Sequence, residues 1–290
     1  MLRITDLSHT YPDGTRALDR VSLAIGTGLF GLLGPNGAGK STLMRVLATV
    51  QRPSGDGTAT LDGVDILAQP AALRRRLGYL PQDFGVYPRI TASAMLDHLA
   101  VLKGVADRSE RRASVDALLA QVGLWDAREK PLTAMSGGMR QRFGIAQALI
   151  GRPRLLIIDE PTAGLDPGER FRCLDLIAGL GGEAVVILST HIVADAAALC
   201  GQVAVLAGGR VLTAGTPADL VAALEGRVWR GVVARDDLAR WRGSDALLWA
   251  QLVGGRRIAH VRAERPPPGF EPIEPTLEDA YFEALGGRPS

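Results

Sequence analysis

Cysteine and lysine are scarce in this 290-residue chain, and long apolar runs are missing. The two cysteines, Cys173 and Cys200, lie far apart and form no C-x-x-C pair, which argues against a metal or dithiol motif and fits a reducing compartment. No apolar run approaches the roughly 20 residues that cross a bilayer, and residues 1–6 carry no signal-peptide pattern. We therefore expect a cytosolic chain whose association with a membrane depends on a partner.

An excess of charge of one sign is also missing. The chain has 33 Lys and Arg against 31 Asp and Glu, a net charge of +2 at pH 7. The arginine triplet at 74–76 falls in a helical-looking segment without interleaved aromatic residues, so we interpret it as a solvated helix face. These patterns predict no nucleic-acid partner. Apolar residues make up 47% of the chain, which is enough for a sizeable core in one large domain or two.

The most informative segment runs from Gly34 to Ser41 and reads G-x-x-x-x-G-K-S. Glycines in this spacing let successive backbone N–H groups point at a phosphate, the lysine reaches the β- and γ-phosphates, and the serine hydroxyl ligates Mg²⁺. The apolar run 28–33 predicts a buried strand that leads into the loop, and a helix from about Lys40 would add its N-terminal dipole. A glycine-rich turn that matches by accident is the alternative, but lysine stands at only three positions in the chain. The predicted phosphate loop comprises Gly34, Pro35, Asn36, Gly37, Ala38, Gly39, Lys40 and Ser41.

Two carboxylates follow another apolar run. Asp159 and Glu160 come directly after residues 155–158, and a second continuous apolar run covers 185–189. Such runs are typical of strands buried on both faces of a parallel sheet, and ligands bind at the carboxyl ends of such strands. Asp159 would hold Mg²⁺ through its water shell, and Glu160 could polarise an attacking water. The alternative is an acidic pair that merely ends a strand.

A third element, Ser136-Gly137-Gly138, opens a segment with helical spacing that runs to about Ile150. Serine at the N-cap and two glycines would leave a bare, positively polarised helix end, which is a second anion site. Alone this pattern is weak, because glycine-rich helix caps are common.

In this order and spacing, the motifs resemble the ATP-binding subunit of an ABC transporter, over about residues 1–220. In that resemblance residues 34–41 are Walker A and 155–160 are Walker B with the catalytic glutamate. The resemblance also implies roles that the chemistry of the motifs did not assign. Tyr11 stacks on adenine, Thr42 extends the nucleotide site, and Gln82 touches Mg²⁺ together with Ser41 and Asp159. The signature motif consists of Ser136, Gly137 and Gly138, while Asp166 belongs to the D-loop and His191 contacts the γ-phosphate. Alternatives remain for two of these: Tyr11 could be a core residue and Gln82 a solvated loop residue.

Two residues depart from the family pattern. Met135 stands where a leucine is usual, and Met139 stands where a glutamine is usual. Neither change removes the backbone N–H groups or the Ser136 hydroxyl. The remaining histidines, His9 and His260 together with His98, have no comparable context, and we expect them to be ordinary surface residues.

The expected fold is α/β. The resemblance implies a P-loop NTPase core with a parallel-rich sheet, an antiparallel β subdomain, a helical subdomain over about 85–150 that carries the signature motif, and a small C-terminal appendage. We place the cassette at 1–224 and the accessory region at 225–290, because three of the four tryptophans and a proline run at 266–268 follow Gly226. This region is expected to pack against the core or a second subunit and to take no part in ATP chemistry.

The resemblance also implies function and partners. We expect an ATP-hydrolysing motor that uses ATP and Mg²⁺, pairs head to tail with a second copy around two ATP molecules, and docks on integral membrane permease subunits at the inner face of the cell membrane. Segments 82–88 and 276–282 resemble subunits of bacterial exporters of drugs, antibiotics or lipids.

Three alternatives stay open. A soluble ABC ATPase of translation would carry two cassettes, and one of DNA repair would need room for coiled coils between Lys40 and Ser136; neither feature is present. An importer ATPase is the second alternative. A regulatory cassette that does not hydrolyse ATP is the third, and the intact Glu160 and His191 count against it.

Overall fold

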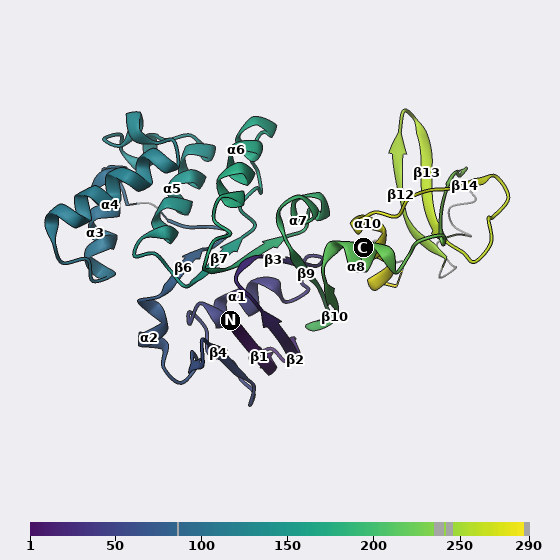
Figure 1. Cartoon of the computed structure of the whole chain (residues 1–290), viewed down its shortest axis with the longest axis horizontal. Helices are drawn as coiled ribbons and strands as arrows, with labels where there is room; N and C mark the ends of the chain where they lie inside the picture. Colours follow the sequence, from purple (N-terminus) through teal and green to yellow (C-terminus); the bar gives the residue numbers. More distant parts are fainter. Residues whose placement is uncertain (86, 235–240, 242–245, 287–290) are drawn as a thin grey trace.

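Three β-sheets organise the chain in the computed structural model, which describes residues 1–85, 87–234, 241 and 246–286 (Figure 1). The first sheet is antiparallel, in the order β2-β1-β4-β5. Its strands are β1 (Leu2–Thr10), β2 (Arg16–Ile25), β4 (Thr58–Leu61) and β5 (Val64–Asp65). Burial alternates along β1, as expected of a half-buried strand, and β1 also buries His9, which is 7% exposed. The expectation that His9 is a surface residue is therefore wrong.

The second sheet is the central one, in the order β10-β9-β3-β8-β7-β6, and all its pairs are parallel except β9 with β10. Every residue of β7 and β8 is buried, as their continuous apolar runs predict. The strands are β3 (Gly28–Leu33), β6 (Leu77–Leu80), β7 (Leu155–Asp159), β8 (Val185–Thr190), β9 (Gln202–Ala207) and β10 (Arg210–Gly215). The parallel strands point their carboxyl ends to one edge, where the predicted nucleotide residues follow them.

Helices cover this sheet and form a layer at one end of the molecule (Figure 1). The α-helices there and beside the sheet are α1 (Lys40–Leu47), α2 (Pro70–Arg74), α3 (Ala92–Leu102), α4 (Arg108–Gln121), α5 (Gly137–Leu149), α6 (Pro167–Ala178), α7 (Val193–Leu199) and α8 (Pro217–Ala222), with short 3-10 turns η1 (Trp125–Ala127) and η2 (Leu132–Ala134). Helix α5, which is predicted to begin at the signature motif, packs between this helical layer and β6. A mixed α/β fold with a parallel-rich sheet is thereby confirmed.

The third sheet lies at the opposite end of the molecule, in the order β12-β13-β11-β14 (Figure 1). It contains β11 (Val228–Val232), β12 (Leu247–Val253), β13 (Arg256–Arg262) and β14 (Phe270–Pro272). A last helix, α10 (Leu277–Ala284), returns from it and packs on α7 and α8. Leu248, Trp249 and Tyr281 accordingly belong to the same hydrophobic cluster as residues of the central sheet.

A buried polar cluster fastens α10 to this third sheet. Asp279 is 0% exposed, and its Oδ1 accepts hydrogen bonds from Trp249 Nε1 at 2.8 Å and His260 Nδ1 at 2.7 Å. An ionised carboxylate only accepts, so the histidine nitrogen carries the proton. The other oxygen of Asp279, Oδ2, accepts hydrogen bonds from the backbone N and from Oγ1 of Thr276, the N-cap of α10, each at 2.8 Å. His260 is thus buried beneath α10, and the expectation that it lies on the surface is wrong.

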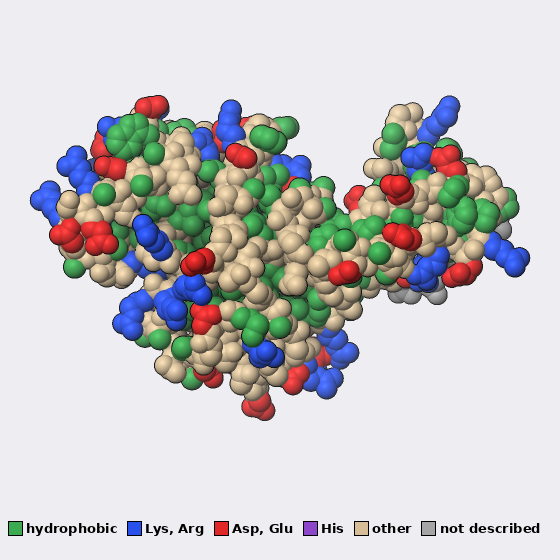
Figure 2. Space-filling view, viewed as in Figure 1, with side chains coloured by type: hydrophobic (Ala, Val, Ile, Leu, Met, Phe, Trp, Pro, Cys, Tyr) green, Lys and Arg blue, Asp and Glu red, His purple; other side chains and the backbone are tan. Residues whose placement is uncertain are grey.

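No helix in the described parts of the chain is long and apolar enough to cross a bilayer. On the face shown in Figure 2, Lys and Arg side chains are spread among acidic ones rather than gathered in one patch.

Candidate active site

The loop between β3 and α1 has the backbone shape that a phosphate loop needs. Gly39 has φ of 104°, in the left-handed region, and a Cβ there would lie 2.3 Å from the carbonyl oxygen of Ala17. Only glycine fits both constraints. Helix α1 begins at the next residue, Lys40, so its free N–H groups and the positive end of its dipole face the loop.

Lys40 lies inside this loop. It is 6% exposed, and its Nζ donates hydrogen bonds to the carbonyl oxygens of Gly34 at 2.6 Å and Pro35 at 3.2 Å. Glu160 Oε1 lies 3.7 Å from the same nitrogen. Burial lowers the pKa of Lys40, and the carboxylates of Glu160 and Asp159 partly oppose that shift. An anion entering the loop would therefore meet a desolvated cation.

The two carboxylates at the end of β7 are held by β8. Ser189 Oγ donates to Asp159 Oδ1 at 2.5 Å and accepts from the backbone N of Glu160 at 3.0 Å. Glu160 has φ of 50°, which is unfavourable for a non-glycine residue and concentrates at functional sites. Its Oε2 lies 2.6 Å from His191 Nδ1. The strained turn thus aims Glu160 at both Lys40 and His191.

A cavity of about 490 Å³ brings most predicted residues together. Tyr11 lines it, and the Tyr11 hydroxyl lies 3.0 Å from Thr42 Oγ1. The predicted site residues in its wall are Tyr11, Pro35, Asn36, Gly37, Ala38, Gly39, Lys40, Ser41, Thr42, Gln82, Glu160 and His191. Segments from both ends of the cassette sequence therefore meet on one pocket.

Gly34 and Asp159, each adjacent in sequence to a residue of the wall, do not line this cavity, and neither do two further predicted groups. Ser136 caps α5, accepting a hydrogen bond from the backbone N of Met139 at 3.2 Å, and Gly137 beside it is exposed. Asp166 caps α6, accepting from the backbone N of Glu169 at 2.9 Å, and is also exposed. In this chain the predicted phosphate loop and Glu160 therefore line one cavity, while the residues predicted for the signature motif and the D-loop lie outside its wall.

The sequence profile of the family described as ABC transporter matches residues 18–163. The chain is 40% identical over 220 residues to the Daunorubicin/doxorubicin resistance ATP-binding protein DrrA of Streptomyces peucetius. This match covers 75% of this chain and 66% of that relative. It is 37% identical over 295 residues to the Methionine import ATP-binding protein MetN 3 of Pseudomonas fluorescens, covering 99% of this chain and 90% of that relative. The chain belongs to the ABC transporter family as an ATP-binding subunit.

A solved structure agrees with this assignment. The ATP-binding cassette MJ0796, in a dimeric post-hydrolysis state bound to ADP and Pi, superposes with a TM-score of 0.67 at 26% identity, covering 74% of this chain and 98% of that one. The matches cover 66% and 59% of the length of the first two curated relatives, so the chain spans less than two thirds of either.

In this ABC cassette, α5 is tied to α6 by Arg142 and Glu169, to which the sequence assigned no role. A Cβ on Gly138 would come within 2.3 Å of the Glu169 side chain, and Glu169 Oε2 lies 3.3 Å from Arg142 Nε. Met135, the departure from the family pattern, is 4% exposed and belongs to the main hydrophobic core. Its role is therefore packing, which a methionine fulfils as well as a leucine.

Residues that could hold Mg²⁺ in this cassette are few and specific. No group of three or more His, Cys, Asp or Glu side chains with metal-binding geometry exists among the described residues. Asp159 and the Ser41 hydroxyl are oxygen ligands of the kind Mg²⁺ uses, and Mg²⁺ sites are usually completed by substrate phosphates and waters. The side chains present therefore fit a metal that arrives with the nucleotide rather than one bound in a protein cage.

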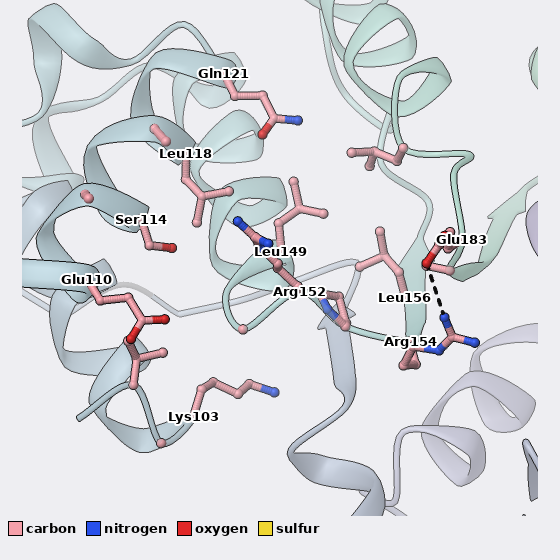
Figure 3. A pocket seen from close by; sticks show the side chains of 18 residues that line it. Lys103, Glu110, Ser114, Leu118, Gln121, Leu149, Arg152, Arg154, Leu156 and Glu183 are labelled. Carbon is pink, nitrogen blue, oxygen red and sulfur yellow. Dashed lines mark ion pairs between the residues drawn. The ribbon is translucent and has the colours of Figure 1, made fainter. Parts of the chain in front are cut away.

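A larger hollow of about 920 Å³ lies away from this chemistry, between α4 and the segment after α6 (Figure 3). Lys103, Leu118 and Arg152 line it, and Arg154 there lies 3.9 Å from Glu183. None of the predicted site residues is in its wall. The predicted residues and their charged groups therefore converge on the smaller cavity and not on the larger one.

Proposed function

We propose that this chain is the ATP-hydrolysing motor subunit of a transporter and that it powers export through separate membrane permease subunits. The observation that carries the proposal is the convergence of Lys40, Glu160 and His191 on the cavity beside the phosphate loop. We take residues 1–224 as the cassette and residues 225–290 as an accessory region.

The arrangement suits phosphoryl transfer to water. The loop amides and Lys40 would hold the β- and γ-phosphates, and Glu160 would orient the attacking water. His191, bonded to Glu160, would contact the γ-phosphate and fix the orientation of that carboxylate. Mg²⁺, held by Asp159, Ser41 and Gln82, would neutralise developing charge on the phosphates.

A second copy would complete the site. The exposed Ser136, Gly137 and Asp166 face away from the cavity of their own chain, so a head-to-tail partner can bring them to the open side of a nucleotide. The helix end at Ser136 offers unpaired N–H groups to the γ-phosphate of the partner. Dimeric MJ0796 supports this arrangement.

The direction of transport is proposed from relatives and two segments. DrrA is named for drug resistance and MetN 3 for methionine import, so the family includes both directions. Segments 82–88 and 276–282 favour the exporters. Inverted membrane vesicles that carry the chain with its permease should accumulate a fluorescent drug such as daunorubicin on addition of ATP. ATP-driven uptake of methionine into right-side-out vesicles loaded with ATP would contradict export.

Lys40→Ala should weaken ATP binding about 10- to 100-fold, since it removes a charge-assisted contact to the phosphates. The affinity is measured by titration of the purified full chain with a fluorescent ATP analogue. Lys130→Ala is the matched control, because Lys130 is exposed and lies outside the cavity. Equal affinities of Lys40→Ala and the control would contradict the nucleotide assignment.

A further inference from the structure

Asp195, in the first turn of α7, is a buried charge that the proposed chemistry does not use. It is 2% exposed, and burying an ionised carboxylate is costly unless it is paired and hydrogen-bonded. Both of its oxygens have partners. Thr162 Oγ1 donates to Oδ2 at 3.0 Å, and Arg170 Nη2 donates to Oδ1 at 2.5 Å.

Each partner belongs to a segment that carries a site residue. Thr162 lies two residues after Glu160, and it is itself buried at 5% exposed. Arg170 lies one helical turn after Asp166 on α6. Asp195 lies four residues after His191. One carboxylate thus joins the three segments that present the catalytic base, the D-loop and the switch histidine.

The geometry closes a ring around the catalytic base. The segments that begin at Glu160 and His191 are linked once by the 2.6 Å contact between those two side chains and a second time by Thr162 with Asp195. The preceding strands β7 and β8 pair in parallel up to Asp159 and Ser189, and the Thr162 bond extends that fixed spacing beyond the turn at Glu160. Arg170 adds α6 to this ring through the other oxygen of the same carboxylate.

The thiols of Cys173 and Cys200 lie near this ion pair, and neither adds a negative charge that would compete with Asp195 for Arg170. Burial, followed by the charge of nearby carboxylates that include Asp195, raises the pKa of Cys173 to about 12. Burial and Asp195 likewise raise the pKa of Cys200 to about 12. Both thiols therefore stay neutral near pH 7, and the ion pair of Asp195 with Arg170 is the charged contact of this cluster.

We propose that Asp195 is a positioning residue for ATP hydrolysis, which holds the Glu160, Asp166 and His191 segments in register through Thr162 and Arg170. This inference rests on the proposed ATPase function. A purely structural anchor of α7 on α6 would stabilise the chain without affecting the catalytic step, and that difference can be measured.

The test compares Asp195→Asn, Arg170→Gln and the double variant with wild type in the full-length protein. Asp195→Asn keeps an acceptor for Thr162 and removes the charge that faces Arg170. We expect kcat for ATP to fall about tenfold in each single variant, while KM for ATP and affinity for ADP stay within about twofold. The double variant should be no slower than either single variant, because each single substitution already breaks the same contact between Asp195 and Arg170. Arg172→Gln is the control, since Arg172 pairs with Glu169 on the same helix and is 62% exposed.

Amide hydrogen exchange without nucleotide supplies a readout independent of turnover. Exchange should rise in Asp195→Asn over both 168–171 and 190–195, because the broken ion pair joins α6 to α7, and it should not rise in Arg172→Gln. Arg170→Gln breaks the same pair from its more exposed end, so the comparison survives if Asp195→Asn does not fold. An unchanged kcat with a lowered melting temperature, or unchanged exchange over 168–171, would overturn the inference. Absence of turnover in the wild type would instead contradict the proposed function.

Discussion

Glu160→Gln is expected to lower ATP turnover by about 10²- to 10⁴-fold, the usual contribution of a general base, while ATP affinity stays within about twofold. The amide keeps the shape of the side chain and can still accept from His191, but it cannot take a proton from water. It also removes the carboxylate 3.7 Å from Lys40 Nζ, which leaves that cation free for phosphate. Turnover should therefore fall without loss of binding.

The measurement is steady-state phosphate release with Mg²⁺ and ATP, run beside nucleotide titrations of the same preparation. Glu183→Gln is the control, because Glu183 is 97% exposed and lines a different hollow. Turnover of Glu160→Gln equal to that of the control would contradict the catalytic assignment, and equal losses of affinity for ATP and ADP would point to a structural role.

Asp279→Ala is expected to destabilise the chain by about 3–5 kcal/mol, the usual result of removing one partner of a buried charged cluster. The substitution leaves Trp249 Nε1 and His260 Nδ1 without the acceptor that they share, and it removes half of the capping box at Thr276. Because α10 packs on α7 and α8, the loss should reach the cassette rather than stay in the third sheet.

The pH dependence of this contribution has a definite sign. Burial alone raises the pKa of Asp279, but hydrogen bonds from His260, Thr276 and Trp249 outweigh it, so the pKa lies below its ordinary value of 3.8. The stabilisation is therefore fully present above about pH 4 and is lost as the pH falls through the lowered folded-state pKa. Urea unfolding at pH 7 and at acid pH measures it, with the exposed Glu274→Ala as control. An Asp279→Ala midpoint equal to that of the control at pH 7 would contradict this account.

Sequence patterns predicted the parts of the fold that depend on local order. The wholly buried strands β7 and β8 follow from their continuous apolar runs, and the phosphate loop follows from a glycine and lysine spacing whose chemistry is local. The N-cap role of Ser136 was also predictable from the sequence, because a serine directly before a helical pattern commonly accepts a hydrogen bond from the first turn of the helix.

Contacts between segments that are far apart in the sequence could not be predicted from it. His9 and His260 looked like surface residues because nothing near them in sequence explains their burial. His260 is buried since Asp279, 19 residues away, supplies an acceptor under a returning helix. Asp195 was missed for the same reason: its partners come from the turn after β7 (Thr162) and from α6 (Arg170), and only the folded chain brings them together.

The C-terminal region packs against the core, which is one of the two arrangements expected from its sequence. Val228 and Tyr281 of this region share a hydrophobic cluster with Leu224 and with residues of the central sheet. A truncation after Gly226 would expose part of that cluster to water, at a cost of about 25 cal/mol per Å² of apolar area. The sequence predicts the change in composition and a short helix over 276–285, but not that this helix returns to pack on α7 and α8.

The claim that a second copy completes the nucleotide site is tested most directly by sedimentation of Glu160→Gln with and without a second change, Ser136→Arg. Glu160→Gln alone should sediment as a dimer with ATP and Mg²⁺ and as a monomer with ADP. Because Ser136 is exposed and lies outside the cavity of its own chain, adding Ser136→Arg should leave the ATP affinity of the monomer unchanged and abolish the ATP-dependent dimer. A dimer that persists with Ser136→Arg, or one that forms equally with ADP, would contradict the head-to-tail site.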